Sequence, residues 1–413
     1  MDKDIARYKV YRSVTPLTGY QELGTTEWNT FPDEKVEPGK KYYYKIAAID
    51  LAGNESNGSE AAEWMLVAPG PTPVRGLIAT DTLWYAGASP YVIAGEITVA
   101  PKAELRIEPG TVIQSQGEGI IVQGKLLARG DQTSLITFTG KEWRGISFQD
   151  TRDTESAIEY AKISGAAIGI SCVSSSPLIA HNQIAHNQVG IRVQESFAQP
   201  KIIGNIISSN AHTGVEIAAM ASPQLEDNEI RGNQENGVLI RDAKPVLVKN
   251  RIMNNGEVGV SVYSSPARLR ENNIHDNGKY AVHNALENEV TVEALDNWWG
   301  FAEGRKILSQ FSGRIDTQRV LDGPFPQGKS IELPILKGPL SGPIERDSFL
   351  VRMHSPYVLE KGVTIEQGAT LFAEPGVVIK YNPGATLVVK DGGIDAQGTE
   401  DRMIIFSANS VSP

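Results

Sequence analysis

The chain has 413 residues, more than one ordinary hydrophobic core holds, so we expect at least two structural units. Its 40 glycines and 23 prolines, with only 7% aromatic residues, are typical of a turn-rich β protein. A formal net charge of −10 without a basic stripe argues against a nucleic-acid partner. No stretch approaches the ~18 uninterrupted apolar residues of a transmembrane helix, so no membrane insertion is expected.

The single cysteine, Cys172, excludes an internal disulfide and says little about the compartment. The charged start of the chain, residues 1–4, lacks the apolar core of a signal peptide, so a secreted protein would be present here as a processed or excised piece. No cofactor is expected, although the acidic balance is compatible with bound calcium.

Residues 8–13 and 42–50 alternate apolar and polar side chains, and a Pro-Gly turn at 38–39 precedes the second stretch. This alternation predicts strands of an antiparallel sandwich. The tyrosine-rich second stretch, followed by Asp-x-x-Gly-Asn-x-Ser at 50–56, resembles the later strands of a fibronectin type III domain. The first two strands of such a domain would lie before Met1. We expect either a truncated sequence, which we favour, or strands supplied by another chain at the sheet edge. The expected domain is 1–66.

Residues 67–74 form a stiff, proline-rich connector, and a β-helix is expected over 75–325. Its opening segment occurs twice: Ser-Pro-Tyr at 89–91 is followed 19 residues on by Glu-Pro-Gly at 108–110, and both tripeptides recur with the same spacing at 355–357 and 374–376. We therefore expect a second linker over 326–343 and the opening coils of a second β-helix over 344–413. Because an incomplete solenoid end exposes an unpaired edge, we expect the natural chain to continue there or to meet another subunit.

Between the two copies the chain repeats itself at nearly constant spacing. Each repeat holds the frame Asn-x-Ile-x-x-Asn, then a small residue and a short alternating strand. Such a repeat has room for about three short strands and no helix, so we expect parallel strands stacked into a parallel β-helix. A proline opens each repeat, at spacings of 23, 23, 22 and 21 residues: Pro177, Pro200, Pro223, Pro245 and Pro266.

The repeated asparagines fall into two columns when the repeats are stacked. Because an amide at a turn tolerates left-handed backbone and bonds neighbouring backbone groups, we expect structural ladders and not a ligand role. Cys172 falls in the inward column of Val193 and Ile217, so we expect a small buried apolar residue. The first ladder is Asn182, Asn205, Asn228, Asn250 and Asn272, and the second is Asn187, Asn210, Asn233, Asn255 and Asn277.

This frame, with the Gly-Ile or Gly-Val that follows it, resembles the right-handed parallel β-helix repeats of bacterial surface and periplasmic proteins. Their superfamily also contains pectate-lyase-like enzymes and a nitrous-oxide-reductase copper-maturation factor. The resemblance implies an all-β fold, a right-handed parallel β-helix solenoid with an N-terminal partial fibronectin type III-like sandwich and the start of a second β-helix. It implies no single activity, because this superfold carries many.

Carbohydrate-active members of that superfamily place their reacting side chains on outward positions of one stacked sheet. Elimination beside a uronate needs a base and a cation or metal that neutralises the carboxylate. Arg241, Tyr263 and His283 are therefore the catalytic candidates, and Arg192 and Glu216 are candidates for ligand binding. A solvated face carries such residues anyway, and we favour that structural interpretation.

Family motifs give no support for catalysis, because the polygalacturonase-like and pectate-lyase-like sets are absent and no pair of aspartates clusters on the repeated strands. The six histidines share no register that would build a metal site, so none is expected. The paired Trp298 and Trp299 resemble a closing motif of these proteins. They either cover the last coil, which we favour, or stack on sugars as ligand-binding residues.

Two functions remain open from the sequence. In the first, which we favour, the chain is a structural or interaction module of a large secreted or cell-surface bacterial protein, with the periplasm as an alternative location. It would present a β-helical rod for binding glycans or other copies and domains of the same surface assembly, including assembly into filaments or a surface layer. In the second, it is a polysaccharide lyase or uronate epimerase acting on the outward face of the stacked sheet.

Overall fold

The computed structural model describes residues 5–66, 69–151, 155–285 and 290–409. The chain divides into two compact units, residues 1–72 with 85–91, and residues 73–84 with 92–413. The connector expected at 67–74 lies partly outside the described residues, as do the chain start at 1–4 and its end at 410–413. In the described ranges no helix is long and apolar enough to cross a membrane.

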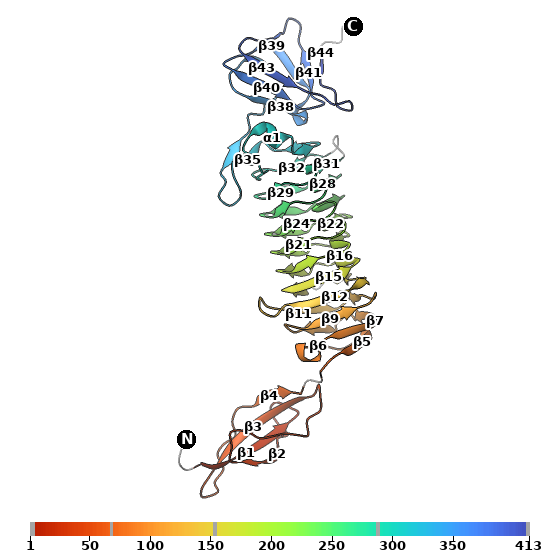
Figure 1. Ribbon diagram of the computed structural model, residues 1–413, viewed down its shortest axis with the longest axis vertical. Helices are drawn as coiled ribbons and strands as arrows, with labels where there is room; N and C mark the ends of the chain where they lie inside the picture. Colours follow the sequence, from red (N-terminus) through yellow and green to blue (C-terminus); the bar gives the residue numbers. More distant parts are fainter. Residues whose placement is uncertain (1–4, 67–68, 152–154, 286–289, 410–413) are drawn as a thin grey trace. The chain divides into compact units, whose positions relative to one another are not determined.

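The first unit holds a four-stranded antiparallel sheet in the order β2-β1-β3-β4 (Figure 1). Val10 lies on the central strand β1, opposite Ile46 of β3 and Gly24 of β2. The two strands predicted at 8–13 and 42–50 are confirmed as β1 and β3, while the finer assignment to a fibronectin type III domain stays a prediction. The strands are β1 (Ile5–Ser13), β2 (Gln21–Thr26), β3 (Lys41–Asp50) and β4 (Ala62–Met65).

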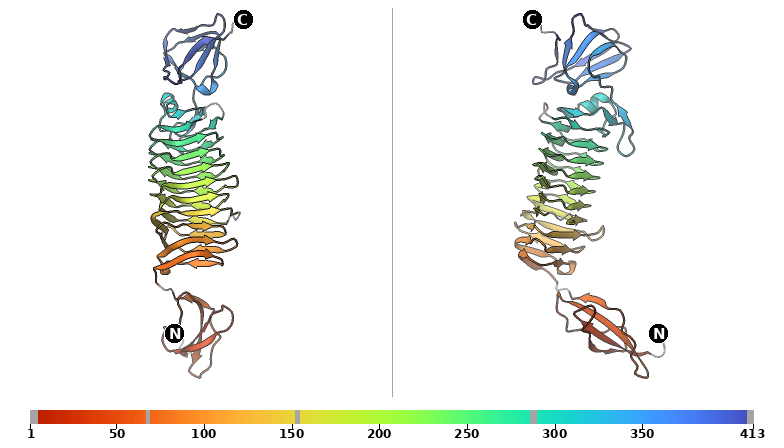
Figure 2. Two further views of the ribbon diagram at one scale, coloured as in Figure 1. Left: turned by 90° about the vertical axis from the view of Figure 1, so that its right-hand side faces the viewer. Right: turned by 180° about the vertical axis from the view of Figure 1, so that it is seen from behind.

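The second unit contains three stacks of parallel strands that follow one another around each coil (Figures 1 and 2). The first stack is β7 (Tyr91–Val99), β10 (Ile120–Val122), β13 (Ile146–Gln149), β16 (Ile168–Val173), β19 (Val189–Gln194), β22 (Val215–Ala218), β25 (Val238–Arg241), β28 (Val258–Tyr263), β31 (Tyr280–Asn284) and β33 (Phe311–Ser312), with β5 (Thr72–Ile78) beside β7. The second stack is β9 (Val112–Ser115), β12 (Ile136–Trp143), β15 (Ala161–Ala166), β18 (Gln183–Ala185), β21 (Ile206–Ser208), β24 (Glu229–Arg231), β27 (Arg251–Met253) and β30 (Asn273–His275). The third stack is β6 (Thr82–Trp84), β8 (Glu104–Ile107), β11 (Lys125–Arg129), β14 (Ala157–Glu159), β17 (Leu178–Ala180), β20 (Lys201–Ile203), β23 (Gln224–Glu226), β26 (Val246–Val248), β29 (Arg268–Arg270), β32 (Val292–Glu293) and β34 (Ile315–Asp316).

The core of this solenoid is a set of apolar columns, one side chain per coil. Because parallel strands pair in register, each inward residue lies directly above its equivalent in the next coil. Cys172 is paired with Phe148 on one side and Val193 on the other, and it is completely buried, as predicted. Burial in this apolar column raises the pKa of its thiol, which keeps it a neutral packing group.

The asparagines form two continuous ladders through the core. Asn205 shows the pattern: its Oδ1 accepts hydrogen bonds from the backbone N–H and the Nδ2 of Asn182, at 2.9 and 3.0 Å. Its own Nδ2 donates to the carbonyl of Ile179 at 2.8 Å and to Oδ1 of Asn228 at 2.9 Å. The first ladder continues one coil beyond the sequence prediction, since Asn272 Nδ2 donates to Asn297 Oδ1 at 2.8 Å.

The small residue after each asparagine frame lets neighbouring coils approach closely. A Cβ placed on Gly237 would lie 2.7 Å from the carbonyl oxygen of Gly259 and 2.8 Å from Cγ2 of Ile252. At Gly214 and Gly190, one and two coils earlier, a Cβ would make the equivalent contacts with the next coil. The repeated glycine is therefore a steric requirement of the stack.

Beyond the last full coils lie a short helix, α1 (Gly304–Leu308), and an antiparallel pair, β35 (Arg319–Leu321) and β36 (Ser330–Glu332). The linker expected at 326–343 thus contains β36 and the start of the next sheet. Two parallel sheets follow: β37 (Leu340–Ile344), β39 (Tyr357–Ile365), β41 (Val378–Tyr381) and β44 (Ile405–Ala408), with β42 (Leu387–Val389) on β39; and β38 (Ser348–Leu350), β40 (Ala369–Ala373) and β43 (Gly392–Ala396).

The duplicated sequence segments share local structure. A 3₁₀ helix precedes the Ser-Pro-Tyr tripeptide in both copies, Ala86–Ala88 in the first and Arg352–His354 in the second. The tyrosine of each tripeptide is buried, and its hydroxyl accepts the backbone N–H of the residue six positions earlier: Tyr85 for Tyr91 at 3.1 Å, and Val351 for Tyr357 at 2.9 Å.

Candidate functional site

The first outward column runs along the first stack of strands. The register places Arg192, Glu216, Leu239, Ser261 and His283 above one another. Arg192 Nε and Glu216 Oε2 form an ion pair at 2.7 Å, so these two ligand-binding candidates bind each other. Leu239 and Ser261, in the middle of the column, are only 8% and 3% exposed and offer little polar surface to a ligand.

The three catalytic candidates divide into a pair and a separate residue. Arg241 and Tyr263 are cross-strand partners, and the guanidinium lies 5.4 Å from the centre of the phenol ring. His283 belongs to the other column, opposite Ser261, and its ring stacks on Tyr280 with centres 6.0 Å apart. The stack therefore brings a cation to a phenol but places the histidine two residues away along the strand direction.

The two closing tryptophans lie in different environments. Trp299 is completely buried and meets the ring of Phe311 edge-on, with centres 4.7 Å apart. Its ring therefore cannot stack on a sugar, which corrects its assignment as a ligand-binding candidate. Trp298 is half-buried and continues the second stack of strands through a parallel bridge to Asn273.

Two of the described histidines on the β-helix contact local side chains. His181 stacks on Tyr160 at 5.0 Å, and His212 Nδ1 is 2.8 Å from Glu235 Oε1. Over the residues that the structure describes, no three His, Cys, Asp or Glu side chains group as metal ligands would. Calcium, with which the acidic composition is compatible, is not tested by this structure.

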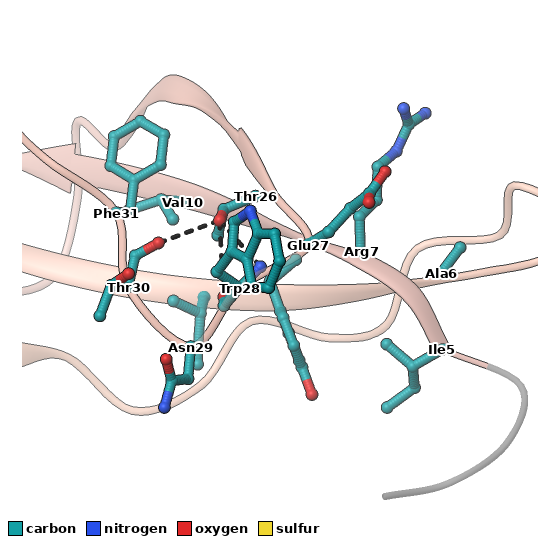
Figure 3. A pocket seen from close by; sticks show the side chains of 12 residues that line it. Ile5, Ala6, Arg7, Val10, Thr26, Glu27, Trp28, Asn29, Thr30 and Phe31 are labelled. Carbon is teal, nitrogen blue, oxygen red and sulfur yellow. Dashed lines mark hydrogen bonds between the residues drawn. The ribbon is translucent and has the colours of Figure 1, made fainter.

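A pocket of about 420 Å³ lies on the antiparallel sheet of the first unit, where sequence reasoning expected no site (Figure 3). Its floor is the apolar face of β1 and β3, on which Val10 is buried while Ile46 is 48% exposed. Phe31 covers part of this face and lies 3.2 Å from a Cβ placed on Gly24. Arg7, Glu27 and Asn29 add polar groups at its edge.

Trp28 is the most exposed large apolar side chain of this pocket, at 76%. A turn with its own hydrogen bonds presents the ring: Thr26 Oγ1 donates to the carbonyl of Thr30 at 2.9 Å and accepts the Trp28 N–H at 3.1 Å (Figure 3). Folding therefore leaves a large amphipathic ring in water beside an apolar hollow. The only sequence signal for it was a tryptophan in a polar turn, because no repeat or motif marks residues 26–30.

A family described as "Right handed beta helix region" matches residues 97–226 and 144–294. This part of the chain is a right-handed β-helix. The matched residues cover both asparagine ladders up to Asn277 and most of the three stacks, so the expected solenoid is confirmed, with its handedness.

Among curated proteins, an exo beta-1,2-glucooligosaccharide sophorohydrolase (non-reducing end) from Parabacteroides distasonis is 45% identical over 60 residues. That stretch is 14% of this chain and 8% of the relative, so this chain covers a small part of that protein.

The β-helix also has solved neighbours of low sequence identity. The A-module of a mannuronan C-5 epimerase from Azotobacter vinelandii is 13% identical with a TM-score of 0.30, over 83% of this chain and 89% of that one. A pectate lyase from Pectobacterium carotovorum is 12% identical with a TM-score of 0.22, over 80% and 88% of the two chains. These likenesses say nothing about substrate.

Proposed function

We propose that this chain is a glycan-binding interaction module of a larger secreted or cell-surface protein, with the sugar bound at Trp28. The observation that carries the proposal is the exposed indole held by the Thr26–Thr30 turn beside an apolar pocket with a polar edge. Sugars present an apolar C–H face and a polar rim, and an amphipathic ring such as Trp matches both. The β-helix serves as the rigid support that carries this unit and its neighbours.

The outward face of the β-helix also favours an interaction module over a lyase or epimerase. Arg192 and Glu216 form an ion pair with each other, and the guanidinium of Arg241 stacks on the ring of Tyr263. A lyase or epimerase would need a base and a cation gathered at one uronate, but the register places His283 in a different column from the Arg241–Tyr263 pair. We therefore assign this face to lateral stability of the stack and to contact with other domains of the surface assembly.

The first unit is proposed to be a sandwich of fibronectin type III type. The sophorohydrolase relative acts on beta-1,2-glucooligosaccharide, which makes β-linked gluco-oligosaccharides the first ligands to try. Linear β-1,3- and β-1,4-linked gluco-oligosaccharides serve as comparison ligands.

Isothermal titration calorimetry of the chain with each oligosaccharide tests the proposal. We expect Trp28→Ala to weaken binding about tenfold, because an aromatic stacking contact contributes about 0.5–1.5 kcal/mol beyond area burial. Trp64→Ala is the matched control, since Trp64 is also exposed, at 47%, but lies on β4 outside the pocket. Absence of binding to every oligosaccharide, or an equal loss in both variants, would overturn the proposal.

A further inference from the structure

A second cavity, of about 300 Å³, lies in the second unit between α1 and the sheet formed by β38, β40 and β43. Three side chains from successive strands form one column along it, Phe349, Phe372 and Asp395. Arg305 and Leu308 of α1 line the opposite side. The cavity is thus built by segments about 90 residues apart in the chain.

One wall of this cavity is aromatic. The rings of Phe349 and Phe372 are stacked, with centres 5.2 Å apart and planes inclined by 19°. Helix α1 approaches them closely because its first residue is Gly304, on which a Cβ would lie 2.7 Å from the Phe349 ring. A flat apolar wall of this kind fits the C–H face of a sugar ring.

The same sheet also carries two carboxyl groups in contrasting surroundings, beside the aromatic rings. Asp395 Oδ2 forms an ion pair with Arg305 at 2.5 Å, and the same guanidinium lies 5.5 Å from the centre of the Phe372 ring. Glu374 accepts a hydrogen bond from the backbone N–H of Arg352 at 2.8 Å. Burial raises the pKa of Glu374 to about 6, although that hydrogen bond and the charges of Arg352 and Arg402 act in the opposite direction.

The strand register fixes the spacing of these carboxyl groups. Ala373 of β40 lies opposite Ala396 of β43, so Glu374 follows opposite Gln397 and lies diagonally across from Asp395. A strand spacing near 4.8 Å and a rise near 3.3 Å per residue then place the two Cα atoms roughly 8 Å apart. Side chains from such positions can reach the carboxyl separations of about 5 to 9.5 Å that glycoside hydrolysis uses.

We propose that this cavity binds one sugar of an oligosaccharide and hydrolyses its glycosidic bond, with Glu374 as proton donor and Asp395 as the second carboxylate. The proton of Glu374 goes to the glycosidic oxygen as the bond from that oxygen to the anomeric carbon breaks. Water adds to the anomeric carbon, and its released proton passes to Asp395 and then through solvent back to Glu374. The products are two sugars with one water consumed, so no oxidant or other co-reactant is needed.

This activity goes beyond glycan binding at Trp28 and rests on different residues in a different unit. The duplicated segment supplies an internal control. Glu108 occupies the same Glu-Pro-Gly position in the first copy, but its side chain is exposed. It lines neither this cavity nor the pocket formed by Asp81, Glu104 and Asp150. Only the second copy is covered by α1.

The test is release of reducing ends by the chain from neutral β-linked gluco-, manno- and galacto-oligosaccharides at pH 5. We expect Glu374→Gln and Asp395→Asn each to lower the rate by at least 100-fold, and Glu108→Gln to leave it unchanged. The wild-type rate should fall as the pH rises through about 6, because the donor must carry its proton. Phe372→Ala should raise KM more than it lowers kcat.

A merely structural role for Glu374 would change the melting temperature of the variant without changing the rate. Absence of turnover on the whole panel, or equal rates for Glu374→Gln and Glu108→Gln, would overturn this proposal. A loss of oligosaccharide binding in Trp28→Ala would still support the proposed function in that case. The two tests therefore distinguish failure of the proposed hydrolysis from failure of the proposed glycan binding.

Discussion

At the scale of single residues, the ladder asparagines form hydrogen bonds with the buried backbone that a hydrophobic side chain could not form. Each one is held in the core and satisfies the backbone of two coils at once, through an oxygen that accepts and an amide that donates. A buried backbone N–H without a partner costs about 1–3 kcal/mol. The ladders therefore allow sharp turns to be buried inside an otherwise apolar solenoid.

Asn228→Ala should lower the free energy of unfolding by about 3 kcal/mol, because it removes the acceptor for the N–H of Asn205 and the donor to Ile202. Urea-induced unfolding followed by circular dichroism measures this. Gln234→Ala removes an amide of similar kind from an exposed position and should change stability by less than about 0.5 kcal/mol. Equal effects would show that the ladder hydrogen bonds contribute nothing special.

The sequence could predict the ladders because five repeats put each asparagine at the same offset from an inward isoleucine. It could not predict Asn297 as a further member, since Trp298 and Trp299 follow it where the frame has x-Ile. Trp28 was missed and Trp299 was kept as a ligand candidate for one reason. Exposure of an aromatic ring depends on what packs on it, and Phe311, which covers Trp299, belongs to a later strand.

At the scale of elements, the short strands are stable only as members of a stack. Most have three to six residues, too few to persist alone, and neighbours above and below supply all their partners. The alternating pattern and the repeat length were enough to predict the parallel stacks. Helix α1 and the β35–β36 pair were not predicted, because they occur once and their residues show neither the strand alternation nor the repeat spacing.

Gly237→Ala should destabilise the stack by about 1–3 kcal/mol, because the new methyl group would press on the carbonyl of Gly259 and on Ile252 in the next coil. Gly393→Ala is the control. A Cβ there would lie at an ordinary 3.7 Å from Thr370 Oγ1, so little change is expected. Thermal melts of both variants compare the two sites, and a larger loss in the control would contradict the close-packing argument.

At the scale of the whole molecule, the duplication shows how one sequence motif takes two environments. The Glu-Pro-Gly copies were recognisable from the sequence, and so was the arrangement of strands around them. The burial of the second glutamate was not, because it depends on α1, which lies 66 residues before Glu374 in the chain. Contacts between distant segments therefore give the two copies of this glutamate different surroundings.

This burial gives the second unit a pH-dependent stability that can be measured without any substrate. The pKa of Glu374 rises from 4.5 to about 6 on folding, so the folded chain holds this proton more tightly than the unfolded chain. The stabilisation is fully present below pH 4.5 and is lost as the pH rises through 6, by up to about 2 kcal/mol. Glu374→Gln removes this loss, so the free energy of unfolding of the variant should rise relative to the wild type by that amount between pH 4 and pH 8 in denaturant titrations.

The control is Glu108→Gln, which changes an exposed side chain and should follow the wild type throughout this pH range. A Glu374→Gln curve parallel to the wild type would mean that the carboxyl group is solvated, and the proposed proton donor would then lack the environment that keeps its proton.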